Sequence, residues 1–174
     1  FIFNNFSDTY SFHDVVKEAG VQGFTEPDPK IDLSGVDVAR KILILIRESG
    51  YEMEMDDIQN NSFLPAECMN TTNNDDFFKS LIKHASHFEN LLAEAKQKNS
   101  RLKFVASFEN GKASVGLQFI PSDSPFYNLE GKDNIVQFYT DRYVDQPLLI
   151  KGAGAGAAVT ASGIFADVVR IGNV

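Results

Sequence analysis

Two charged residues of one predicted helix have the types and the spacing that a polar reaction site requires. Asp37 and Lys41 are four positions apart, so on a helix they lie about 40° from each other and share one face. Three more carboxylates, Glu26, Asp28 and Asp32, come from the proline-rich turn just before this helix. A rigid loop that places acids beside an ammonium is typical of pockets that bind polar substrates and transfer protons.

The same cluster also has a purely structural interpretation. Asp32 or Ser34 would cap the N-terminus of the helix, and Asp37 would complement the helix dipole. Asp37 and Lys41 would then form an ordinary exposed ion pair, a common feature of surface helices. Spacing alone favours this structural interpretation over the chemical one.

The elements that position the cluster follow from hydrophobic periodicity. Its helix is predicted from about Val36 to Ser49, ending at Gly50, with an apolar stripe of Val38, Ile42, Leu45 and Ile46. Two other helices are predicted over residues 11–19, where Ser11 is the cap, and 76–99. Strands are predicted over residues 1–6, 51–60, 102–108, 112–120, 135–143 and 147–151.

Residues 102–120 carry the clearest hairpin signal, because two alternating apolar runs flank Asn110 and Gly111. Hairpin-linked strands with helices between them predict an α+β fold, in which helices cover one face of a mixed or antiparallel sheet. The other face of that sheet would need a partner. We therefore expect a homodimer formed through the sheet.

Composition excludes several classes of protein. A net charge of −8 at pH 7, without any run of Lys or Arg longer than two residues, argues against a nucleic-acid partner. The single cysteine, Cys68, excludes a disulfide framework and fits a reducing compartment such as the cytoplasm. No apolar stretch is long enough to span a membrane. His84 and His87 have a spacing that a metal could use, but without a nearby third ligand we predict a solvated pair and no metal site.

A glycine turn lies between a predicted strand and the last predicted helix. Gly152, Gly154 and Ala157 satisfy a G-x-G-x-x-G/A pattern, which taken alone indicates a dinucleotide-binding fold. That interpretation fails, because the sequence ends one helix later and lacks the remaining βαβ unit. Bare glycine backbone at a helix N-terminus can still approach a cofactor, and the small residues that follow also suit tight helix packing.

Residues 25–41, TEPDPKIDLSGVDVARK, resemble the T-E-P-D-P-R-D-D-L-S-G-x-D-V-A-R-K pattern of homoserine dehydrogenases. Lys30 and Ile31 depart from it, where Arg and Asp are usual. The glycine turn is similar to the family's G-A-G-A-G-x-x-V-T-A-x-G segment. The resemblance spans nearly the whole sequence.

The resemblance implies an enzyme that interconverts L-homoserine and L-aspartate 4-semialdehyde with NADP or NAD as cofactor. It implies that Lys41 transfers the proton and that Glu26 and Asp37 bind the small-molecule substrate, with Asp32 orienting Lys41 or the substrate. Gly156, and Glu26 in part, would contact the cofactor. Threonine and methionine biosynthesis is the implied pathway.

The resemblance also implies an arrangement of domains. Residues 1–151 would be the substrate-binding, catalytic and dimerisation domain, and residues 152–174 would return to a nucleotide-binding domain. The abrupt apolar opening FIFNNF suggests a piece of a longer protein, most similar to bifunctional aspartokinase/homoserine dehydrogenases, and this piece alone should be inactive. Two rivals stay open: a non-catalytic dimerisation or regulatory module with the same fold, and a dehydrogenase of another small hydroxy acid.

Overall fold

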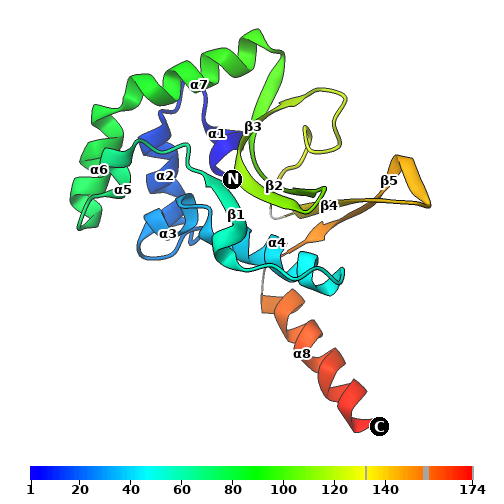
Figure 1. The fold of residues 1–174 in the computed structure, drawn as a ribbon. Helices are drawn as coiled ribbons and strands as arrows, with labels where there is room; N and C mark the ends of the chain where they lie inside the picture. Colours follow the sequence, from blue (N-terminus) through cyan, green and yellow to red (C-terminus); the bar gives the residue numbers. More distant parts are fainter. Residues whose placement is uncertain (132, 155–156, 174) are drawn as a thin grey trace. The chain divides into compact units, whose positions relative to one another are not determined.

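The computed structural model describes residues 1–131, 133–154 and 157–173, which form two compact units, Phe1–Tyr127 and Asn128–Val174. Figure 1 shows the elements, and each unit is described by itself below. Together they form an α+β fold, as predicted. In chain order the elements are α1 (Ile2–Asn5), α2 (Phe12–Val21), α3 (Pro29–Leu33), α4 (Val36–Glu48), the 3-10 helix η1 (Met55–Asp57), β1 (Ile58–Asn61), α5 (Ala66–Met69), α6 (Asn74–Lys83), α7 (Ala85–Gln97), β2 (Ser100–Glu109), β3 (Lys112–Pro121), β4 (Asp133–Thr140), β5 (Tyr143–Ala153) and α8 (Ala157–Gly172).

The first unit is built on a three-stranded mixed sheet with strand order β1-β3-β2. β2 and β3 form the predicted hairpin, and its turn residues Asn110 and Gly111 have φ of 51° and 76°. Tight hairpin turns of this kind need positive φ at both central positions, which Asn and Gly tolerate. β1 adds to the other edge of β3 as a parallel strand.

One face of this sheet is apolar and is covered by helices. Cross-strand partners Leu102 and Phe119, Phe104 and Leu117, and Ala106 and Val115 place these side chains on the same face. Two clusters of buried residues lie against it, one with residues of α1, α2, α6 and α7 and one with residues of α4. The larger cluster contains Phe6, Phe12, Val16, Leu33, Phe63, Leu64, Cys68, Phe77, Leu81, Phe88, Ala95 and Leu102.

The helix that carries the charged cluster packs through a face close to the predicted one. α4 buries Ala39, Leu43 and Ile46, while Val38 and Ile42 are partly buried beside them. Ile46 is therefore confirmed as a core residue. The buried face is centred on Ala39, Leu43 and Ile46, and the predicted Leu45 is only partly buried.

Several predicted elements are wrong. Residues 1–6 are not a strand but contain the short helix α1, because Phe3 and Phe6 pack their rings on Phe63 and Phe12, with centroids 5.3 Å and 5.5 Å apart. The predicted strand over residues 51–60 is reduced to β1, because the side chains of Glu54 and Asp57 cap the 3-10 turn before it.

The predicted helix over residues 76–99 is two helices, α6 and α7, which meet at His84. Glu67 of α5 accepts hydrogen bonds from Lys83 Nζ at 2.7 Å and from His84 Nε2 at 3.0 Å, and so holds this junction. Periodicity did not reveal the break, because apolar residues keep three-to-four spacing across it.

The second unit contains the antiparallel pair β4-β5 and helix α8. The strand and the helix predicted on either side of the glycine-rich segment are present as β5 and α8. None of the described residues of α8 is buried, and its large apolar side chains are exposed. Among the described residues, no helix is both long and apolar enough to cross a membrane.

Candidate functional site

The predicted pair of charged residues is present near the start of α4. Lys41 Nζ lies 2.7 Å from Asp37 Oδ2, and the two side chains are 63% and 53% exposed. An exposed ion pair of this kind contributes about 0.3–0.5 kcal/mol to stability. Such a pair stabilises the fold little, but its two groups are accessible to a ligand.

Gly35 determines where α4 begins. It is the N-cap, with φ of 78°, and a Cβ atom built there would lie 2.7 Å from Phe104 Cζ and 3.1 Å from Asn60 Oδ1. Asn60 Nδ2 also donates to the Ser34 carbonyl oxygen at 2.7 Å. The start of the helix, and with it Asp37 and Lys41, is therefore fixed to strands β1 and β2.

The acids of the preceding loop have separate structural partners. Asp28 caps α3, a helix that was not predicted, by accepting a hydrogen bond from the Lys30 N–H at 3.0 Å. Asp32 does not cap α4, because its Oδ2 accepts from the Glu26 N–H at 2.8 Å. Ser34 Oγ accepts from the Val36 N–H at 3.3 Å, but Gly35 is the N-cap of α4 and no side chain caps it, so the predicted cap at Asp32 or Ser34 is wrong.

The glycine turn belongs to the second unit. A Cβ atom at Gly154 would lie 1.6 Å from Asn134 Nδ2, so that position admits only glycine without rearrangement. Gly156, the predicted cofactor contact, lies outside the described residues. The 16-residue helix α8 follows the turn, an arrangement that suits an anionic group at a helix N-terminus.

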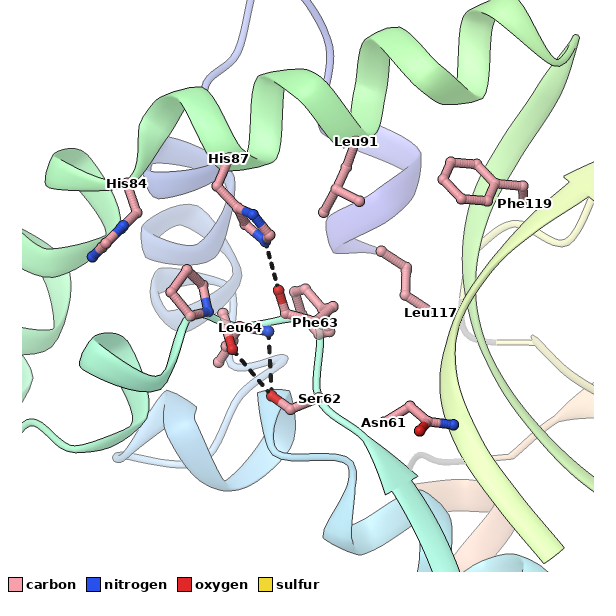
Figure 2. A pocket seen from close by; sticks show the side chains of 10 residues that line it. Asn61, Ser62, Phe63, Leu64, His84, His87, Leu91, Leu117 and Phe119 are labelled. Carbon is pink, nitrogen blue, oxygen red and sulfur yellow. Dashed lines mark hydrogen bonds between the residues drawn. The ribbon is translucent and has the colours of Figure 1, made fainter.

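Figure 2 shows a pocket of about 530 Å³ that contains none of the predicted site residues. His87 Nε2 hydrogen-bonds to the Phe63 carbonyl oxygen at 2.8 Å, and His84 is held by Glu67. The two histidines are thus partly buried and bonded to protein groups, and not solvated as predicted. No group of three potential metal-ligating side chains occurs in the part of the chain that the structure describes.

Two hydrogen bonds that the sequence does not predict tie residues 27–30 to residues 71–74. Lys30 Nζ donates to the Thr71 carbonyl oxygen at 2.6 Å, and Asn74 Nδ2 donates to the Pro27 carbonyl oxygen at 2.7 Å. These partners are 41 and 47 positions apart in the sequence, and a single sequence carries no signal that would pair them. For residues 70–74 the sequence predicts only a polar loop.

Comparison with solved structures defines the class of the fold. A Candida auris protein of unknown function has 38% identity and a TM-score of 0.87, with 97% of this chain and 48% of that chain covered. Staphylococcus aureus homoserine dehydrogenase has 22% identity and a TM-score of 0.71, with 98% and 39% covered. The fold is thus that of a domain found in a dehydrogenase.

A family model described as homoserine dehydrogenase matches residues 1–169. The chain belongs to the homoserine dehydrogenase family. It is 40% identical to homoserine dehydrogenase of Schizosaccharomyces pombe over 166 residues, which cover 94% of this chain and 44% of the relative. It is 42% identical to a chloroplastic bifunctional aspartokinase/homoserine dehydrogenase of Zea mays over 175 residues, covering 99% of this chain and 19% of the relative. The chain therefore spans less than half the length of these relatives.

Proposed function

We propose that this chain supplies the substrate-binding and proton-transfer groups of an NAD(P)-dependent oxidoreductase that interconverts L-homoserine and L-aspartate 4-semialdehyde. Membership of the family supports the reaction, and one observation supports the site. Lys41 Nζ lies 2.7 Å from Asp37 Oδ2, on a helix whose start is held by the Ser34–Gly35 turn of the matching motif. These two groups are accessible, as a substrate site requires.

Each side chain has a role in this proposal. Lys41 exchanges a proton with the substrate hydroxyl, while Glu26 and Asp37 bind the substrate ammonium group through their negative charges. Asp32 accepts a hydrogen bond from the Glu26 N–H. Through this contact it positions Glu26 and so orients the substrate. A nicotinamide cofactor, NADP or NAD, provides the acceptor for the hydride when it is bound.

Lysine ammonium groups in water rarely give up a proton at neutral pH, so this role requires desolvation or a water chain when substrate binds. Both side chains are more than half exposed in this chain alone. The rest of the protein must therefore cover them. A nucleotide-binding domain is the part of the family that we expect to do so, and without it this chain should not turn over.

The second unit provides the surface that we assign to that domain. Val159, Ile164, Phe165, Val168 and Ile171 of α8 are all exposed, which is unusual for a helix with so many large apolar side chains. We propose that α8 packs on the nucleotide-binding domain and that Gly156, with Glu26, contacts the cofactor. We also propose that the protein is located in the cytoplasm and forms a homodimer through the sheet.

The experiment is substitution of Lys41 in the full-length protein. Lys41→Ala should lower kcat for homoserine oxidation by about 10²- to 10⁴-fold, the usual contribution of a positioned acid or base. Lys79→Ala is the matched control, because Lys79 also forms an exposed ion pair on a helix, 3.4 Å from Asp76. Unchanged turnover in a folded Lys41→Ala protein would favour the non-catalytic module. Comparing homoserine with malate and hydroxybutyrate tests the choice of substrate.

A further inference from the structure

The loop that carries Glu26 is held from a distant part of the chain. We call residues 26–28 the acidic loop. Asn74, the first residue of α6, donates its side-chain N–H to the Pro27 carbonyl oxygen at 2.7 Å. Lys30, whose side chain is only 13% exposed, donates to the Thr71 carbonyl oxygen at 2.6 Å. The acidic loop is thus tied to the segment that enters α6.

Two hydrogen bonds fix the main chain at and next to Glu26. Its N–H is bonded to Asp32 Oδ2 at 2.8 Å, and the carbonyl of the next residue, Pro27, is bonded to Asn74. Main-chain groups on both sides of the Glu26 Cα atom are therefore fixed. Its carboxylate is exposed and makes no hydrogen bond or ion pair with any other residue that the structure describes.

We infer that Asn74 is a positioning residue for Glu26. This inference rests on the proposed function, in which the Glu26 carboxylate binds the substrate ammonium group. A carboxylate on a flexible loop must be ordered when substrate binds, and that ordering weakens affinity. The hydrogen bond from Asn74 orders the loop beforehand, so that the free carboxylate is presented in one place.

A purely structural role for Asn74 makes a different prediction. In that case its loss would lower the free energy of unfolding and leave substrate affinity unchanged in the folded protein. A positioning role affects KM for homoserine while kcat is retained, because the loop contributes to binding and not to proton transfer. Measuring KM, kcat and thermal stability on the same variants distinguishes the positioning role of Asn74 from the purely structural one.

The test uses the full-length protein with Asn74→Asp and Asn74→Ala. Asn74→Asp keeps the shape and places a favourable charge at the helix N-terminus, but it cannot donate to the Pro27 carbonyl. Loss of one neutral hydrogen bond corresponds to a rise in KM of roughly 2- to 10-fold for both variants. Asn70→Ala is the control, because Asn70 is an exposed amide of the same segment, and its KM should not change.

A double-mutant cycle identifies the residue through which Asn74 acts. In a Glu26→Ala background, Asn74→Asp should cause no further rise in KM, because the carboxylate that it positions is gone. Additive effects would overturn the inference, as would an unchanged KM in Asn74→Asp when Glu26→Ala raises it. If Glu26→Ala alone leaves KM unchanged, the proposed role of Glu26 fails, and the inference fails with it.

Discussion

Gly35→Ala tests whether the start of α4 is locked against the sheet. The new methyl group would meet Phe104 Cζ at 2.7 Å and Asn60 Oδ1 at 3.1 Å, and the residue would keep φ of 78°. Left-handed backbone costs a non-glycine residue about 1–2 kcal/mol. Overpacking of a well-packed core adds roughly 1–3 kcal/mol. The free energy of unfolding should therefore fall by about 2–5 kcal/mol, a large part of the stability of a typical domain.

Gly50→Ala is the matched control, because Gly50 also has a left-handed conformation, with φ of 89°, but nothing lies within 4 Å of a Cβ atom built there. It should lose only the backbone part, about 1–2 kcal/mol. Chemical denaturation of the full-length protein, followed by circular dichroism, gives both values. Equal losses at the two glycines would refute the reasoning, because the contact with Phe104 would then have no energetic consequence. Phe104→Leu combined with Gly35→Ala should recover part of the loss, since the shorter side chain makes room.

Two further predictions concern the region around α5. Cys68 is fully buried, and burial raises the pKa of its thiol. A disulfide reagent at pH 8 should therefore label the protein in denaturant but not in its native state. Rapid labelling of the native protein would contradict this packing. Hydrogen bonds from Lys83 and His84 lower the pKa of the Glu67 carboxyl below its ordinary 4.5, so the stability that they provide is present above that pH and is lost as the pH falls through the lowered pKa. Glu67→Gln should therefore flatten the acid side of the stability profile measured by thermal denaturation between about pH 5 and pH 2, and an unchanged slope would count against the contact.

Local chemistry made part of the fold predictable. The Asn110-Gly111 turn and the alternation on both sides of it predict the hairpin, and the structure contains it, with Glu109 paired with Lys112 across the turn. Ser11 was predicted as the cap of α2, and its side chain accepts from the Asp14 N–H. Elements that depend on distant residues were missed: α1 packs Ile2 and Phe3 against the larger core cluster, and α6 ends where Glu67 holds His84.

The candidate site shows the same division. The Asp37–Lys41 pair follows from helix spacing alone, and the structure contains it with Nζ and Oδ2 2.7 Å apart. The partner of Asp32 could not be predicted, because a carboxylate in a proline-rich turn has several nearby N–H groups to choose from. The ties from Asn74 and Thr71 cross more than forty positions of sequence, and periodicity or capping rules do not reach that far.

The two halves of the candidate site are held by different parts of the first unit. Asp37 and Lys41 move with α4, whose start is packed on Phe104 of the hairpin, while Glu26 moves with the acidic loop that α6 holds. A change in either attachment therefore alters the distance between the Glu26 carboxylate and the Asp37–Lys41 pair without changing any of the three charges. Substitutions at Gly35 and Asn74 should for this reason weaken homoserine binding independently of each other, and their effects on KM should combine multiplicatively if the two attachments are separate.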